Sequence, residues 1–322
     1  MIYSVLRWIA GIALHWFYGD IRVVGKEKIP RNVPLLIAVN HPNALIDALV
    51  VGWLMPRRVV MTAKATLLNN PFIAALFRLV GVVPLRRTSD EKRHQAGEPS
   101  NPARNSAAFR EMLEVLSRRG AVLIFPEGTS HSNKHLAPLK SGLARVALQA
   151  RDNAHIKSVQ IIPIGLLFEN KSVPGSTVGV RVGDPIDVDS WPSGSDHADL
   201  TAHLAIRLRD VAQIATLPPK TAEAAGSNRL KQAAIAVAAA WGRLTHQAAI
   251  RVARRLAVGM STDADQPAMF TVIIGVALVL VTYAIHLAVI GALAHSFWIT
   301  AVYLVALIAG AYWAAFEPHV RS

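Results

Sequence analysis

Apolar residues come in short runs and in helical spacings over the first two thirds of the chain. A short apolar run bounded by Gly, Pro or charged residues predicts a strand, and apolar residues three and four apart predict a helix. We expect strands at 21–24, 35–39, 59–62, 121–125, 159–168 and 179–182, and helices at 44–54, 71–79, 106–118, 141–151 and 199–214. This alternation predicts an α/β domain over residues 20–217, with a long exposed loop at 89–105.

Residues 1–19 are apolar and aromatic but carry Arg7 and His15. No small-residue cleavage site follows, so we do not expect a cleaved signal peptide. The pattern predicts a helix that lies in a membrane interface with its Trp and Tyr side chains at headgroup level. The alternative is a helix that packs against the following domain.

Residues 218–267 predict a linker followed by a basic amphipathic helix over 230–256. Its apolar residues share one stripe, which consists of Leu230, Ala234, Val237, Trp241, Leu244, Ala248, Val252 and Leu256. Basic and amide side chains lie largely opposite, namely Arg229, Gln232, Arg243, Gln247, Arg251 and Arg254. Such a helix is typical of a membrane surface. Packing on the α/β domain is the alternative.

Two apolar runs, 269–294 and 297–316, are each long enough to cross a hydrocarbon core of about 30 Å. Only His295 and Ser296 separate them, so residues 268–317 predict a transmembrane helical hairpin. Arginines precede and follow the hairpin, while its tip carries no Lys or Arg. We therefore expect both ends, and the α/β domain with them, on the cytoplasmic face. His286 lies inside the first run, and we expect it to point to the interface or to a neighbour.

Composition supports a membrane protein. The 322 residues are 52% hydrophobic with a mean hydropathy of +0.33, and the net charge is +13. Such a charge favours an anionic partner: a phospholipid surface, a phosphorylated substrate or a nucleic acid. We find no nucleic-acid-binding motif and expect no nucleic acid as a partner, whereas a membrane explains charge and hydropathy together. The chain has no Cys, which excludes disulfides, thiolate metal sites and a Cys nucleophile.

The strongest candidate for chemistry is His41, which follows the apolar run 35–39, with Asp47 six residues later. Pro42 disfavours helical dihedrals at His41, so the His precedes the helix that Asp47 joins in its first turn. There the carboxylate accepts one ring N–H while the other ring nitrogen takes a proton. The alternative is a His that caps the helix and an Asp that complements its dipole.

Three further blocks contain candidate site residues. Arg86 and Arg87 end the segment 81–87 and suit a phosphate, unless they form only a solvated basic turn. Glu127 and Gly128 follow an apolar strand, where a ligand can approach the backbone closely; a Pro-Gly turn is the alternative. Pro163 stands inside the apolar strand at 159–168, which indicates an edge, an end or a bulge beside a site.

Taken together and in this order, the four blocks resemble those of the glycerolipid acyltransferase family, which includes 1-acylglycerol-3-phosphate and glycerol-3-phosphate acyltransferases. The resemblance covers about residues 20–217 and implies an α/β domain around a mixed sheet, with His41 as general base and Asp47 as its partner. Five residues separate this His and Asp, where the family's first motif has four. That spacing resembles a subgroup variant and leaves the acceptor open.

The resemblance also implies roles for the other blocks. Arg87, with Arg86 beside it, matches the motif that binds the acceptor phosphate. The third motif, implicated in acceptor binding, corresponds to Glu127, Gly128 and Thr129, and Lys140 resembles a basic position downstream of it. The fourth motif, associated with the acyl pocket, corresponds to Ile162, Pro163 and Ile164.

The implied activity is transfer of an acyl group from acyl-CoA or acyl carrier protein to the hydroxyl of a phosphorylated glycerol, with no cofactor. We expect 1-acylglycerol 3-phosphate as acceptor and phosphatidic acid as product, at a bacterial-type inner membrane. Glycerol 3-phosphate or another lysolipid is the alternative acceptor, and a non-catalytic scaffold is the alternative class. A nuclease or other phosphate hydrolase is a third possibility, but it would need metal-binding carboxylates, which we do not find in the sequence. His131 and His135 lack an acidic third ligand nearby, so we expect no metal.

Overall fold

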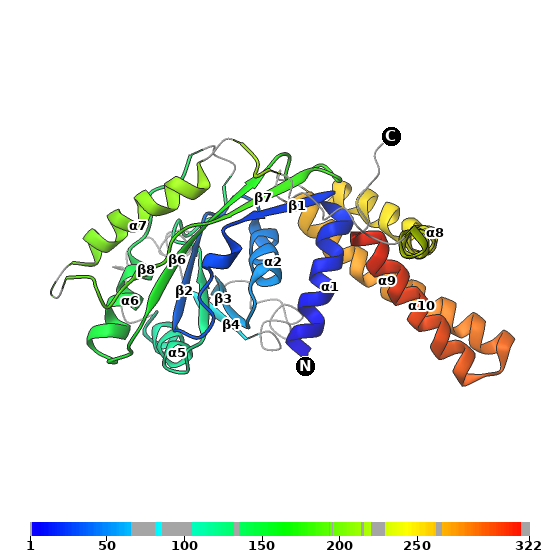
Figure 1. Ribbon diagram of the computed structural model, residues 1–322, viewed down its shortest axis with the longest axis horizontal. Helices are drawn as coiled ribbons and strands as arrows, with labels where there is room; N and C mark the ends of the chain where they lie inside the picture. Colours follow the sequence, from blue (N-terminus) through cyan, green and yellow to red (C-terminus); the bar gives the residue numbers. More distant parts are fainter. Residues whose placement is uncertain are drawn as a thin grey trace.

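An eight-stranded sheet lies at the centre of the computed structural model (Figure 1). The structure describes residues 2–65, 81–85, 105–131, 135–192, 194, 196–213, 216–219, 229–261 and 266–316. The strands are β1 (Asp20–Val24), β2 (Leu35–Val39), β3 (Val59–Lys64), β4 (Val82–Leu85), β5 (Ala121–Ile124), β6 (Gln160–Phe168), β7 (Thr177–Val182) and β8 (Ile186–Asp187).

The strand order is β1-β7-β6-β2-β5-β3-β4, with β8 paired to β6. Strands β6, β2, β5, β3 and β4 run parallel, while β7 and β8 pair with β6 antiparallel. The predicted α/β domain around a mixed sheet is therefore confirmed. The bounds expected for β2 and for the helix at 44–54 are also those of the structure.

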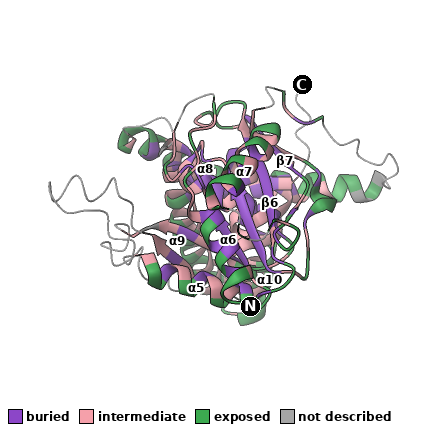
Figure 2. Ribbon diagram, turned by 90° about the vertical axis from the view of Figure 1, so that its left-hand side faces the viewer, coloured by how far each residue is buried: buried purple, intermediate pink, exposed green. Residues whose placement is uncertain are grey.

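The central strand β2 is buried on both faces. Leu35, Ile37 and Val39 point into one core, and Leu36 and Ala38 point into the other. Helices α1 (Ile2–Phe17) and α2 (Ala44–Leu54) cover the first core. Helices α5 (Ser106–Ser117), α6 (Gly142–Asp152) and α7 (His197–Ala212) cover the second. Figure 2 shows α6 and α7 in front of the buried strands β6 and β7.

The sequence patterns missed two strands. β4 has only four residues, and Pro84 interrupts it, while β8 has only two. Neither is long enough to show the period-2 alternation that identifies a strand. The helix expected at 71–79 lies outside the described residues, as does the loop expected at 89–105 apart from Asn105.

Three helices follow the α/β domain: α8 (Arg229–Met260), α9 (Gln266–Ala294) and α10 (Phe297–Phe316). Helices α9 and α10 form the expected hairpin, which projects away from the sheet (Figure 1), and both are long and apolar enough to cross a membrane. His286 Nδ1 lies 2.9 Å from the Tyr303 hydroxyl across the hairpin. It thus contacts a neighbour, as expected.

Helix α8 packs on both hairpin helices through a face of small residues rather than through its apolar stripe. A Cβ atom on Gly242 would lie 1.9 Å from the carbonyl oxygen of Gly310, so the two backbones are in direct contact. The same face buries Ala239, His246, Ala249, Ala253 and Ala257. The apolar stripe stays largely outside this packing, with Leu230 79% and Leu244 75% exposed.

Helix α1 joins these helices to the α/β domain. Trp16 Nε1 donates to the carbonyl oxygen of Ala311 at 3.2 Å, and the Trp8 ring stacks on Tyr312. On its other side, Gly11 lies against the Trp53 ring of α2. One face of α1 therefore packs against protein, while Ile2 and Val5 stay exposed. We call α1, α8, α9 and α10 the helical module.

Candidate active site

The parallel strands bring His41 and Glu127 to one edge of the sheet. The carboxyl ends of β2, β5 and β6 lie side by side there, because these strands pair in parallel. His41 follows β2, and Glu127 follows β5. β4 ends at Leu85 in the same parallel set, directly before Arg86 and Arg87, which lie outside the described residues.

His41 and Asp47 form the expected pair. The distance from His41 Nδ1 to Asp47 Oδ2 is 2.9 Å, with the His side chain 11% and the Asp side chain 0% exposed. The imidazole stacks on the Phe125 ring, with 3.8 Å between the ring centroids. Among the described residues, nothing hydrogen-bonds His41 Nε2, so this nitrogen is free for a ligand.

The loop between β2 and α2 fixes the Asp47 carboxylate through a backbone hydrogen bond. The backbone N–H of Asn43 donates to Asp47 Oδ2 at 2.7 Å, the same oxygen that His41 contacts. Burial raises the pKa of Asp47, against the opposing effect of these two hydrogen bonds. Ala44, the first residue of α2, has a φ of 47°, a left-handed conformation that costs on the order of 1 kcal/mol. Its N–H donates to Ser130 Oγ, which ties this turn to the loop after β5.

Glu127 joins the two loops. Its Oε1 accepts from the backbone N–H of His41 at 2.8 Å, and its Oε2 accepts from the backbone N–H of Ala137 at 2.7 Å. His131 Nε2 lies 2.5 Å from Oε2, and the N–H of His131 donates to the carbonyl oxygen of His41. The Glu127 side chain is fully buried, so in this structure its carboxylate binds protein groups and fixes the backbone of His41.

Gly128, Thr129 and Lys140 line the outer side of the same loop. Gly128 has a φ of 76°, which an L-residue rarely adopts, and a Cβ there would lie 3.4 Å from Lys140 Cγ. The N–H of Lys140 donates to the carbonyl oxygen of Pro126. The side chains of Thr129 and Lys140 are exposed and reach solvent beside the site.

Ile162, Pro163 and Ile164 are buried in β6. The expectation that Pro163 marks an edge or an end of the sheet is wrong, because β6 pairs with β2 on one side and with β8 and β7 on the other. β8 pairs with residues 160 and 161 and β7 with residues 164–168. Pro163 stands in the gap between these two partners, where its missing N–H costs no ladder bond.

Sequence reasoning missed the groups behind Asp47. Asn43 is fully buried, and its Nδ2 donates to the Tyr18 hydroxyl at 2.8 Å. The Tyr18 hydroxyl in turn donates to the carbonyl oxygen of Lys171, whose Nζ donates to the carbonyl oxygen of Pro42. Burial raises the pKa of Tyr18, so this hydroxyl stays protonated. Asn43 lies within the motif itself, whereas no sequence signal points to Tyr18.

Comparison with known proteins places this site in a family. Residues 20–167 match the family model described as Acyltransferase, a segment that contains His41, Asp47 and Glu127. The chain carries an acyltransferase-family domain. The α/β unit described above is hereafter the acyltransferase domain, and the family resemblance seen in the motifs is confirmed.

Named relatives agree at the level of the family. A 1-acyl-sn-glycerol-3-phosphate acyltransferase of Limnanthes douglasii is 29% identical over 192 residues, which cover 57% of this chain and 60% of that protein. Glycerol-3-phosphate O-acyltransferase 1 of Saccharomyces cerevisiae is 23% identical over 268 residues, which cover 58% of this chain and 35% of that protein. The chain thus spans less than two thirds of the length of either relative.

Among solved structures, a 1-acyl-sn-glycerophosphate acyltransferase of Thermotoga maritima aligns with a TM-score of 0.49 and 19% identity. The alignment covers 65% of this chain and 77% of that one. Helices α8, α9 and α10 begin after residue 167 and so lie outside the segment that matches the family model.

Proposed function

We propose that this protein is a membrane-bound O-acyltransferase that moves a fatty acyl group from a thioester to the hydroxyl of a phosphorylated glycerol. The observation that carries the proposal is the 2.9 Å contact between His41 Nδ1 and the buried Asp47 at the carboxyl edge of the sheet, with His41 Nε2 left free. A His–Asp pair in this arrangement suits general-base catalysis.

In the proposed mechanism, His41 Nε2 removes the proton of the acceptor hydroxyl. The oxygen attacks the thioester carbonyl carbon, the new C–O bond forms and the C–S bond breaks. The leaving thiolate takes the proton back from the imidazolium, which Asp47 stabilises meanwhile. General-base assistance supplies about 10²–10⁴-fold of rate, so positioning of the substrates and stabilisation of the oxyanion supply the remainder.

We assign recognition of the acceptor phosphate to Arg86, Arg87 and Lys140. Glu127, Gly128 and Thr129 shape the loop after β5, on which Lys140 also lies. The exposed Lys140 lies against Gly128 on that loop, and the two arginines follow β4 in the sequence. Guanidinium groups suit a phosphate because they donate two parallel hydrogen bonds. The acyl-pocket role of Ile162, Pro163 and Ile164 rests on the motif resemblance alone, since their side chains are buried in β6.

We place the protein in a bacterial-type inner membrane, held by α9 and α10, with the acyltransferase domain on the cytoplasmic face. The support is the length and apolarity of these two helices, together with the arginines of α8 before the hairpin. A labelling probe at the hairpin tip, on Ser296, should then react from outside the cytoplasm. Reaction only after lysis would reverse the orientation.

For the acceptor we propose 1-acylglycerol 3-phosphate, which gives phosphatidic acid, because the Limnanthes relative carries that activity in its name. Glycerol 3-phosphate is the alternative, favoured by the name of the yeast relative. The donor is acyl-CoA or acyl carrier protein. Neither donor nor acceptor requires a cofactor for the step described.

The test uses purified full chain with labelled acyl-CoA or labelled acyl carrier protein as donor. The panel of acceptors is 1-acylglycerol 3-phosphate, glycerol 3-phosphate and an uncharged monoacylglycerol. We expect phosphatidic acid from the first, and we expect Arg87→Ala to raise the KM for that acceptor more than the KM for the donor. Product from glycerol 3-phosphate alone would select the alternative acceptor. Absence of turnover with every phosphorylated acceptor, from either donor, would overturn the proposal and favour the alternative that the protein is a non-catalytic scaffold.

A further inference from the structure

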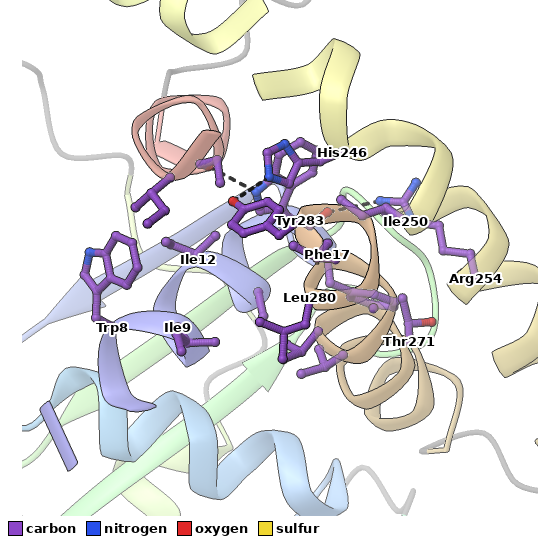
Figure 3. A pocket seen from close by; sticks show the side chains of 18 of the residues that line it. Trp8, Ile9, Ile12, Phe17, His246, Ile250, Arg254, Thr271, Leu280 and Tyr283 are labelled. Carbon is purple, nitrogen blue, oxygen red and sulfur yellow. Dashed lines mark hydrogen bonds between the residues drawn. The ribbon is translucent and has the colours of Figure 1, made fainter. Parts of the chain in front are cut away.

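An apolar pocket of about 330 Å³ lies within the helical module, between α1, α8, α9 and α10 (Figure 3). Its walls come from side chains such as Trp8 and Ile12 of α1, Ile250 of α8, and Val276 and Leu280 of α9. This volume is in the range of small-ligand sites, which is about 300–1,000 Å³. Only α1 among these helices precedes the acyltransferase domain, and none lies within residues 20–167.

Arg254 lies at one end of this pocket, beside Thr271, and Trp8 lies at the other (Figure 3). Arg254 Nη2 donates to the carbonyl oxygen of Trp16 at 3.0 Å. That hydrogen bond caps the carboxyl end of α1, and this structural role accounts for one N–H group of the guanidinium. A guanidinium has five N–H donors, however, and Arg254 Nε is buried without a hydrogen-bond partner in the described structure.

No carboxylate of the helical module can pair with Arg254. Helices α1, α8, α9 and α10 contain no Asp or Glu, whereas α1 carries one Arg or Lys and α8 carries six. Asp263 and Asp265, between α8 and α9, lie outside the described residues. Glu317, directly after α10, also lies outside the described residues. A half-buried cation that has no carboxylate beside it in the described part of the chain, at the end of an apolar pocket, is complementary to an anion that carries a hydrocarbon chain.

His246 and Tyr283, two of the other polar side chains of the pocket, already have hydrogen-bond partners. His246 Nε2 lies 2.8 Å from the Tyr283 hydroxyl, and His246 Nδ1 lies 2.8 Å from the carbonyl oxygen of Gly242. A ligand therefore needs one anionic group for Arg254 and methylene groups elsewhere. Val272, Val276 and Tyr283 line the pocket from one face of α9, so a chain that fills it lies along a helix long enough to cross a membrane.

We propose that this pocket holds one acyl chain of an anionic phospholipid from the surrounding bilayer, with the lipid phosphate on Arg254. The bilayer is the source because the neighbouring surfaces of α9 and α10 expose large apolar side chains, such as Val281, Ile285 and Val302. The proposal concerns the helical module and does not depend on the acyltransferase activity.

The test is titration of the detergent-purified full chain with phosphatidylglycerol and with phosphatidylcholine of the same chains, followed by native mass spectrometry. We expect one site with about tenfold or greater preference for phosphatidylglycerol. Arg254→Gln should remove that preference, whereas Arg255→Gln, an equal loss of charge at the adjacent exposed residue, should retain it. Equal losses in both variants would reduce the effect to general surface charge and overturn the site.

A second pair of variants tests the pocket itself. A Cβ on Gly275 would meet only Ala253 at 3.8 Å, so Gly275→Leu has room to enter the pocket and fill it. It should weaken binding of both lipids at least tenfold, while Gly291→Leu, further along α9 and outside the pocket lining, should not. Unchanged lipid binding by a folded Gly275→Leu variant, judged by thermal unfolding, would refute the proposal. The arginine pair still decides the matter if that variant does not fold.

Competition separates a bilayer lipid from the acyltransferase's own acceptor. With acyl donor left out, 1-acylglycerol 3-phosphate should displace phosphatidylglycerol no better than phosphatidylglycerol displaces itself. Tighter binding of the acceptor, lost in Arg254→Gln, would make the pocket a substrate site and overturn the assignment to a bilayer lipid. His41→Ala should bind phosphatidylglycerol as the unaltered chain does, so failure of the catalytic proposal leaves this one standing.

Discussion

The acyltransferase domain and the helical module bury different kinds of surface. In the domain, large aliphatic side chains fill two cores, and the buried carboxylates Asp47 and Glu127 accept hydrogen bonds from backbone N–H groups. In the module, α8 packs on the hairpin through glycine, alanine and other small residues, the outer surface is apolar, and the four helices contain no carboxylate. A hydrophobic side chain therefore marks the inside of the first region and the outside of the second.

Under the proposed function, this difference separates catalysis from membrane anchoring. The groups that can move a proton lie at the carboxyl edge of the sheet, where short loops fix them through backbone contacts. The module supplies apolar length and positive charge, neither of which requires precise side-chain geometry. A change in one region should therefore leave the defining property of the other intact, and four changes test this from the largest effect to the smallest.

His41→Ala should lower acyl transfer by about 10²–10⁴-fold, the range that general-base assistance supplies. The side chain lies at the edge of the sheet, so helix content, membrane insertion and lipid binding should not change. Turnover with labelled acyl-CoA and membrane fractionation measure the two properties. Retained turnover would remove His41 from the mechanism.

Asp47→Asn should also lower turnover, by less than His41→Ala, because the base remains but loses the charge that stabilises its imidazolium form. The effect of this substitution on stability should depend on pH. Burial raises the pKa of Asp47 above its unfolded value, so the contribution of this group to stability is full below the unfolded pKa and is lost as the pH rises through the folded pKa.

The Asn variant lacks this titration. Its unfolding temperature relative to that of the unaltered chain should therefore rise as the pH increases above about 4, the ordinary pKa of an aspartate. Thermal unfolding at a series of pH values provides the measurement. A difference that shrinks with rising pH would mean that hydrogen bonding, rather than burial, controls this carboxyl.

Gly242→Leu should damage the module and spare the domain. The new side chain meets the backbone of Gly310, and overpacking of this kind costs about 1–3 kcal/mol. We expect α8 to become sensitive to trypsin at its arginines in detergent, while His41-dependent turnover on detergent-dispersed substrates persists. Gly259→Leu on the same helix meets nothing within 4 Å and serves as the control. Equal protection of both variants would contradict the packing of α8 on α10.

The smallest effect should come from the apolar stripe of α8. Leu244→Gln alters an exposed side chain and should change the free energy of unfolding in detergent by less than about 0.5 kcal/mol. Ala257→Leu on the buried face should cost about 1–3 kcal/mol. Chemical unfolding of both variants compares them, and the reverse ranking would show that the stripe is the packed face.

The same comparison explains what could be predicted from the sequence. In the acyltransferase domain, apolar side chains lie inside and polar ones face water, so the apolar runs predicted the bounds of β2 and α2 to the residue. Pro42 correctly placed His41 before the helix. In the module the apolar stripe of α8 could not identify the packed face. Helices beside a membrane expose apolar side chains, and it is the small residues that permit close approach.

The rest of the site depended on contacts distant in sequence. Tyr18 contacts Asn43 from 25 residues away, and Glu127 accepts from the backbone of His41 from 86 residues away. No local pattern predicts such pairs, because periodicity reports which face a residue occupies and not which partner it meets. Pro163 shows the same limit, since only the strand order places it in the gap between β8 and β7.

Under the proposed function, in which the acceptor is a lipid of the bilayer, helix α1 has a mechanical consequence. Trp16 donates a hydrogen bond to α10, and Tyr18, two residues later, contacts the asparagine whose backbone N–H donates to Asp47. One rigid helix would then hold the His41 imidazole at a set height above the lipid, which a flexible linker would not do. When the bilayer thickens or thins, the hairpin and His41 would move together, and the acceptor hydroxyl would meet His41 at a constant depth.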